Sequence, residues 1–239
     1  MNILMARIFW VFAIKSLKMK LAKQTNIFRK GFTLAEVLMS LGIVGVVAAI
    51  IMVTVVPKIQ DAQFKAKFKT VYSDVAQVTS KIKTDNGNSL KGVFTNHNVM
   101  RDKFKQYLNT IKSCDAGQAF GNCWHNMDGS SKYLNGTPIT TGWGALPTII
   151  LNNGVLLRFW LGNSNCTSTT YSGSIQVCGN IDIDVNGFKG PNVVGKDIFL
   201  IWIIENGIKP WGINGDTKNC VSSDVGMGCA AKVLKGEDY

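Results

Sequence analysis

The sequence has few of the residues on which enzyme and metal chemistry usually depends. Its 239 residues include only two histidines, His97 and His125, and no P-loop, G-x-S-x-G motif or paired-glycine nucleotide fingerprint. The stretch Cys123-Trp124-His125 holds a thiol two residues from an imidazole, a spacing that rarely gives the geometry of a nucleophile and its base. These absences predict a protein that is not an enzyme and requires no cofactor.

Acidic residues are missing from the first 31 positions, which hold seven lysines or arginines. The whole chain has 26 basic and 15 acidic residues and a net charge of +11, so residues 32–239 retain 19 basic against 15 acidic residues, or +4. Most of the excess charge therefore belongs to a basic leader, which is typical of a segment kept on the cytoplasmic side of a membrane. The remainder gives no strong nucleic-acid signal, since no basic, aromatic cluster stands out.

Charge is also missing from residues 37–56, twenty consecutive positions whose only hydroxyl side chains are Ser40 and Thr54. A helix of that length rises about 30 Å, which matches the hydrocarbon core of a bilayer. The pattern predicts a membrane-spanning helix, because only a helix satisfies the backbone of a single segment in lipid. Pro57 then ends or kinks it.

Apolar residues return after Pro57 with the spacing of an amphipathic helix. They are Phe64, Phe68, Val71, Val75, Val78 and Ile82. We therefore expect one helix of roughly fifty residues, with a transmembrane half over 32–56 and an amphipathic half over 57–87. The latter packs on a soluble domain and ends at Asp85-Asn86-Gly87, where Asn86 or Gly87 adopts the left-handed conformation.

Residues 88–239 are expected to form a globular antiparallel sheet domain. Asn153-Gly154 and Asn206-Gly207 each stand between apolar runs, as in β-hairpins. Apolar residues alternate with Asp182 and Asp184 around 181–185, which predicts a strand with one buried and one solvated face. Residues 114–144 and 212–230 have no periodicity and are expected to be loops. Trp160 and Trp202 lie inside strand runs, whereas Trp124, Trp143 and Trp211 lie in glycine-rich loops and are candidates for exposure.

Six cysteines follow the predicted membrane span and form three close pairs in the sequence. Local pairing gives Cys114 with Cys123, Cys166 with Cys178, and Cys220 with Cys229. An even number in an extracytoplasmic chain favours disulfides, although fifteen connectivities are formally open. A zinc site is the competing interpretation, but the chain has no C-x2-C spacing and only two histidines.

The stretch KGFTLAEVLMSLGIVGVVAAI closely resembles the N-terminal signature of type IV pilins and type II secretion pseudopilins. The resemblance covers residues 29 to about 85 and implies an α+β, pilin-like fold. It also implies that a prepilin peptidase cleaves between Gly31 and Phe32 and methylates the new N-terminus. Glu36 falls at the fifth mature position, where the family has its glutamate, and the resemblance implies that it pairs with the N-terminal amine of a neighbouring subunit during assembly.

The chemistry of Glu36 agrees with this resemblance. An ionised carboxylate in hydrocarbon costs several kcal/mol unless a cation compensates it, and cleavage would create one at Phe32. Such a pair would also fix the register of neighbouring helices. The alternative is a glutamate at the headgroup level that only complements the helix dipole.

The predicted leader, residues 1–31, departs from the family in its length and in the apolar stretch 3–14, which is too short to span a membrane. Either Met19 is the true start, or the chain belongs to a subclass with extended leaders. We favour Met19, and neither choice alters the mature protein.

A second motif lies at residues 182–187. Asp182, Asp184 and Asn186 precede Gly187 with the spacing of a calcium loop. Val193 stands where an EF-hand has its glutamate, so that Asp197 or Asn192 would have to close the site. Some pseudopilins bind calcium in a C-terminal loop, so Ca²⁺ is a candidate ligand of Asp182, Asp184, Asn186 and Asp197. The alternative is a strand followed by an Asn-Gly turn.

Three functions are therefore open. The first is a major or minor type IV pilus subunit, which begins as a single-pass protein of the inner membrane and ends in an extracellular fibre. The second is a pseudopilin of a periplasmic piston. The third is a single-span membrane protein with a ligand-binding domain. The first two imply other pilin subunits and a pilus or secretion assembly machinery as partners.

Overall fold

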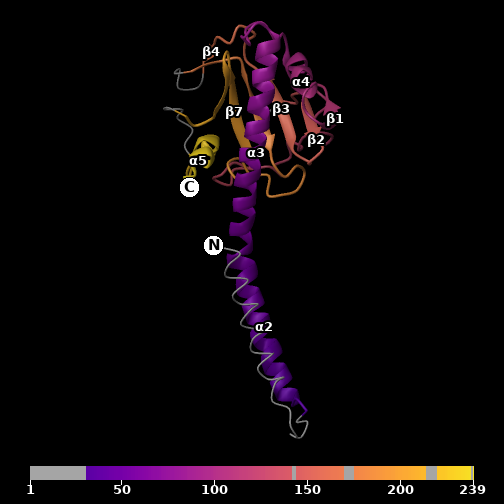
Figure 1. Cartoon of the computed structure of the whole chain (residues 1–239). Coiled ribbons are helices and arrows are strands. Elements are labelled where there is room, and N and C mark those ends of the chain that lie inside the picture. Colours follow the sequence, from indigo (N-terminus) through magenta and orange to yellow (C-terminus); the bar gives the residue numbers. More distant parts are fainter. Residues whose placement is uncertain (1–30, 142–143, 170–174, 214–219, 238) are drawn as a thin grey trace, which may run out of the picture. The chain divides into compact units, whose positions relative to one another are not determined.

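A computed structural model describes residues 31–141, 144–169, 175–213, 220–237 and 239 (Figure 1). The predicted leader, with its alternative start at Met19, lies outside these residues apart from Gly31. The chain divides into two compact units, residues 1–53 and 54–239. Each unit is described by itself.

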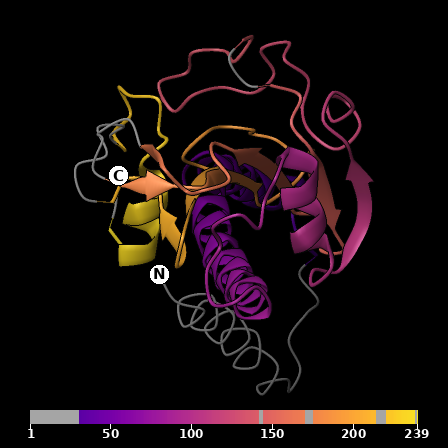
Figure 2. The same cartoon turned by 90° about the horizontal axis from the view of Figure 1, so that it is seen from above.

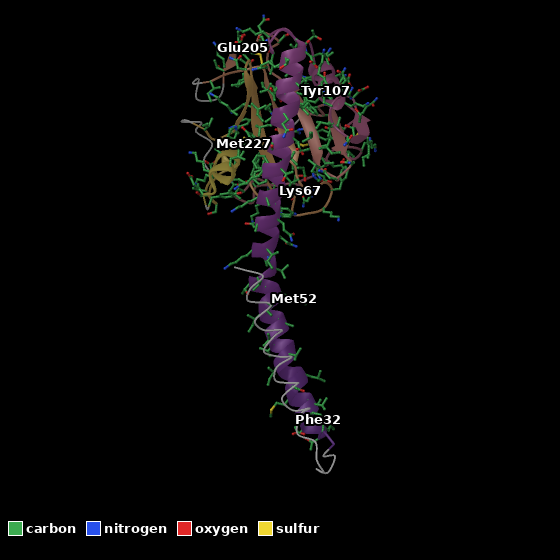
Figure 3. The ribbon with its side chains drawn as sticks, viewed as in Figure 1. Phe32, Met52, Lys67, Tyr107, Glu205 and Met227 are labelled. Carbon is green, nitrogen blue, oxygen red and sulfur yellow. A yellow bond between two sulfur atoms is a disulfide. The ribbon has the colours of Figure 1, made fainter. Side chains whose placement is uncertain are left out.

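Helix α2 spans Leu34–Thr54 and carries one charged residue, Glu36. None of its residues is buried, and its apolar side chains, such as that of Met52, extend on all sides (Figure 3). The helical stretch Leu34–Asp85 contains an 18-residue window of mean hydropathy 2.6, long and apolar enough to cross a membrane. A helix that is apolar all round requires lipid or other helices around it.

Helix α3 spans Val56–Asp85 and confirms the predicted amphipathic continuation. Pro57 lies in its first turn, where the missing N–H has no intrahelical partner to lose. Its buried face consists of Phe68, Val71, Val75, Val78, Thr79 and Ile82. The helix ends at the predicted position, because Gly87 adopts the left-handed conformation with a φ of 75°.

Six antiparallel strands form the main sheet in the order β1-β2-β3-β6-β7-β8. Their bounds are Thr110–Cys114 for β1, Thr148–Leu151 for β2, Leu156–Leu161 for β3, Gly179–Asp184 for β6, Ile198–Ile204 for β7 and Gly207–Pro210 for β8. A separate pair joins β4, Ser168–Thr169, to β5, Gln176–Val177. Both predicted hairpins are confirmed as β2-β3 and β7-β8, and Pro210 ends a short edge strand.

One face of the sheet packs on α3. Phe68 stacks on Phe199 with ring centroids 4.4 Å apart, and Ile181 and Ile201 belong to the same core. The opposite face forms a second buried cluster that includes Trp124, Leu156, Leu200, Trp202 and Trp211. Figure 2 shows loop segments on this side of the sheet and α3 on the other. The sheet is therefore covered on both faces.

Two short helices were not predicted from the sequence. Helix α4, His97–Lys105, is capped by the preceding residue Asn96, whose side chain accepts a hydrogen bond from the Val99 N–H. Helix α5, Cys229–Lys235, ends at Gly236, which has a φ of 78°. Their buried residues Phe104 and Val233 extend the core beside α3.

The three predicted disulfides are confirmed as Cys114–Cys123, Cys166–Cys178 and Cys220–Cys229. Each joins cysteines that are nine or twelve positions apart. The zinc alternative is therefore wrong, because all six thiols are consumed.

The predicted solvated face of the strand at 181–185 is wrong. Asp182 and Asp184 are 2% and 0% exposed, because loops cover the face toward which they point. Trp124 and Trp211 are buried as well, although their glycine-rich surroundings favoured exposure. Trp143 lies outside the described residues. Periodicity in the sequence shows only how neighbouring residues alternate between two faces, whereas the loops that bury this face come from distant parts of the chain.

Candidate functional site

The start of α2 is a capping box formed by Thr33 and Glu36. The Thr33 N–H and hydroxyl each donate to Glu36 Oε2 at 2.9 Å, and the Glu36 N–H donates to Thr33 Oγ1 at 3.3 Å. This reciprocal pattern satisfies backbone donors that the first helical turn leaves open. The T-x-x-E spacing of Thr33 and Glu36 is the sequence signal for this capping box, which is not among the features predicted above.

The Glu36 carboxylate has no cation beside it in the described part of the chain, where its hydrogen bonds all come from Thr33. It lies at the end of a helix with twenty other residues, none of them charged. When α2 is surrounded by lipid or by similar helices, this negative charge requires a positive partner from elsewhere.

The predicted cleavage bond joins two exposed residues. Phe32 is 85% exposed, and a Cβ atom built on Gly31 would meet no atom within 4 Å. Neither residue lies in a helix, because α2 begins at Leu34. The predicted cleavage bond is therefore uncovered in the described part of the chain.

The predicted calcium ligands lie elsewhere, at the end of β6 and in the loop after it. Asp182 Oδ2 accepts a hydrogen bond from Arg158 Nε at 2.9 Å, and its Oδ1 accepts one from Asn180 Nδ2 at 2.7 Å. Burial raises the pKa of Asp182, while the Arg158 guanidinium and the Asn180 amide oppose that rise. Arg158 and Asp182 lie directly opposite each other on β3 and β6.

The other acidic oxygens are also occupied. Asp184 Oδ2 lies 2.6 Å from His125 Nε2, and its Oδ1 accepts the N–H groups of Asn186 and Gly187. Asp197 accepts two hydrogen bonds from backbone N–H groups of the preceding loop, from residue 192 at 2.7 Å and from residue 193 at 2.6 Å. Asn186 turns its amide nitrogen toward the carbonyl oxygens of residues 189 and 190.

This geometry does not fit a calcium ion held by Asp182, Asp184, Asn186 and Asp197 together. Five of the six oxygens of the three carboxylates accept a hydrogen bond from a protein donor, and the sixth, Asp184 Oδ2, lies 2.6 Å from His125 Nε2. The Arg158 charge also opposes a second cation near Asp182. The described residues also contain no group of three or more His, Cys, Asp or Glu side chains placed to hold a metal. The buried acids instead tie the loops to the sheet.

A measurable pH dependence follows from Asp184. Burial raises the pKa of this carboxyl to about 6, against hydrogen bonding and charge from His125, which lower it. Between pH ~4 and ~6 the folded state therefore keeps a proton on Asp184 that the unfolded state releases. The contribution of the protonated carboxyl to folding stability is complete below pH ~4 and is lost as the pH rises through ~6. The Asp184→Asn variant has no carboxyl to titrate, so its unfolding free energy should not fall with this group. The unfolding free energy of the variant minus that of wild type should therefore rise by on the order of 2–3 kcal/mol from pH 4 to pH 7.

Denaturant unfolding of both chains across this pH range measures the effect. Asp74→Asn is the matched control, because Asp74 is an exposed acid on α3. The unfolding free energy of this variant should differ from that of wild type by the same amount at every pH. A pH-independent difference between Asp184→Asn and wild type would contradict the assignment.

Arg158 is not among the candidate site residues that the sequence singles out, and His125 stands out there only as a neighbour of Cys123 and as one of two histidines available to zinc. Cys123 is instead bonded to Cys114, and the His125 ring reaches Asp184, 59 positions away. The register that places Arg158 opposite Asp182 depends on how β3 pairs with β6, a strand that does not follow it directly in the chain. No local sequence motif predicts the Arg158–Asp182 pair or the His125–Asp184 pair.

Comparison with known proteins bears on the N-terminal segment alone. Residues 28–52 match the family model described as the prokaryotic N-terminal methylation motif. No curated protein and no solved structure matches the chain. The matched range contains Gly31, Phe32, the Thr33–Glu36 capping box and most of α2. The chain therefore carries the N-terminal methylation signature of type IV pilins and pseudopilins, on a fold that joins a long apolar helix to an antiparallel α+β domain.

Proposed function

We propose that the chain is a structural, non-enzymatic subunit of a type IV pilus. In this proposal prepilin peptidase cleaves the precursor between Gly31 and Phe32 at the inner membrane, and the mature chains polymerise through α2. The observation that carries it is α2 itself, apolar on every side with one carboxylate in its first turn. Such a helix is suited first to lipid and then to a bundle of identical helices.

The three disulfides of the domain favour an external pilus over a periplasmic pseudopilus. Three disulfides cross-link the loop-rich segments, and a fibre exposed to shear and proteases benefits from loops that cannot open locally. The proposed partners are prepilin peptidase, further pilin subunits and the assembly machinery.

Mass spectrometry of the chain from sheared fibres tests the proposal. We expect a mature N-terminus at Phe32 that carries one methyl group, and three intact disulfides. Gly31→Val should leave the precursor uncleaved and the fibres absent, while the domain folds normally, because a side chain at residue 31 meets nothing within 4 Å. Ala35→Val is the matched control, since it adds a similar side chain to an exposed position of the mature helix.

Two outcomes would count against this function. Recovery of the methylated chain only in the periplasm and membrane, with none in sheared fibres, would identify a pseudopilin. A mature chain that keeps Gly31 would remove the assembly function altogether.

A further inference from the structure

The face of the sheet opposite α3 carries two rows of side chains in register across three strands. Trp160 on β3 lies opposite Asn180 on β6, which lies opposite Trp202 on β7. The adjacent row contains the Arg158–Asp182 ion pair. An amide is therefore flanked by two indole rings, and a buried, compensated ion pair lies beside it.

These side chains line a cavity of about 560 Å³. Trp211 adds a third indole, which stacks on Trp202 with ring centroids 3.8 Å apart and an interplanar angle of 26°. Met227, labelled in Figure 3, and His97 are further lining residues. The volume lies within the range of about 300–1,000 Å³ that is usual for small-molecule sites, which combine aromatic walls with a few polar groups.

Trp160 is the part of the wall best placed to meet a ligand. It is half-buried, and the structure shows no ring contact or hydrogen bond between its indole and any described side chain. Its six-membered ring rests beside Gly162, where an added Cβ atom would lie 2.7 Å from Cη2. Glycine at this position thus leaves room for the ring along the strand.

The polar groups of the lining carry no net charge. The Arg158 guanidinium and the Asp182 carboxylate compensate each other. The backbone N–H of Leu161 donates to His97 Nδ1 at 3.0 Å, which leaves the neutral ring with a proton on Nε2. Burial lowers the pKa of His97 and so favours this neutral form. The cavity therefore offers hydrogen-bonding groups without attraction for an anion or a cation.

We propose that this cavity binds a neutral saccharide of one or two rings. A sugar ring has C–H bonds on its faces, which match flat indole surfaces, and hydroxyl groups around its rim, which match an amide and an imidazole N–H. The lining provides the two kinds of surface side by side, because strand pairing places Asn180 between Trp160 and Trp202. The site does not depend on whether the chain assembles into a fibre.

Saturation-transfer difference NMR on the full chain tests this, in a detergent without a sugar headgroup. The probes are glucose, galactose, mannose, N-acetylglucosamine and their common disaccharides, with glucuronic acid as a charged comparison and indole as an apolar one. We expect at least one neutral sugar to bind, and Trp160→Ala to weaken it about tenfold, as the loss of an aromatic platform implies. Trp160→Phe keeps a ring and should weaken binding less.

Phe188→Ala is the matched control, because Phe188 is an aromatic residue that is 51% exposed and lies outside the cavity. Its replacement should leave the sugar affinity unchanged. The proposal is overturned if no neutral sugar gives a signal at millimolar concentration, if only glucuronic acid or indole binds, or if Trp160→Ala and Trp160→Phe both bind as tightly as wild type.

Discussion

Replacing Glu36 with leucine is expected to lower the yield of sheared fibres by about a hundredfold or more. If the carboxylate compensates the N-terminal ammonium of a neighbouring subunit, its removal leaves a buried cation unpaired, at a cost of about 3–5 kcal/mol per contact. A difference of 1.4 kcal/mol corresponds to about a factor of ten in an equilibrium constant. Quantitative immunoblotting of the sheared fraction measures the loss.

Glu36→Gln separates charge pairing from helix capping. Glutamine can replace glutamate in a capping box, so the hydrogen bonds with Thr33 remain while the negative charge disappears. We expect this variant to fail like Glu36→Leu. Ser40→Ala is the control, because Ser40 lies one turn further along α2 and its hydroxyl only donates to the Val37 carbonyl oxygen. Normal fibres from Glu36→Gln would assign capping, not charge, to this residue.

The second large effect is expected on folding stability, when the buried ion pair between Arg158 and Asp182 is broken. Arg158 and Asp182 are 4% and 2% exposed, so Arg158→Met should leave a carboxylate without its counter-charge in the interior. Loss of one partner of a buried pair costs about 3–5 kcal/mol. We expect a decrease of this size in the unfolding free energy, measured by denaturant titration of the full chain.

Two further variants make this prediction specific. Removing both charges with Arg158→Met and Asp182→Leu should recover most of the loss, because no unpaired ion remains. Lys91→Met breaks an exposed ion pair with Glu205 that has a similar distance, 2.9 Å, and it should cost less than about 1 kcal/mol. The prediction is wrong if Arg158→Met and Lys91→Met have equal effects.

The parts of the fold that could be predicted from sequence are those with a local physical cause. Twenty uncharged residues required a helix in lipid, the spacing from Phe68 to Ile82 gave the buried face of α3, and Asn153-Gly154 gave a hairpin turn. The close sequence spacing of the cysteine pairs likewise favoured the three disulfides that the structure contains.

The remaining features depend on contacts between distant residues. Helix α4 has only nine residues, too few for periodicity alone to identify it. Asp182 and Asp184 alternate with apolar residues like a solvated face, yet Arg158 and His125 reach them from 24 and 59 positions away. The cavity lies between three paired strands and the loops that cover them. Its shape therefore depends on the strand register and on the path of those loops, neither of which a local sequence pattern shows.

The positions of the disulfides determine how the domain would respond to mechanical load. All three lie between residues 114 and 229, so none attaches α3 to the sheet. Side-chain packing such as that of Phe68 on Phe199 holds α3 against the sheet, and no disulfide joins the two. In the proposed fibre, a pull on the helix would therefore load this side-chain packing before it loads the cross-linked loops.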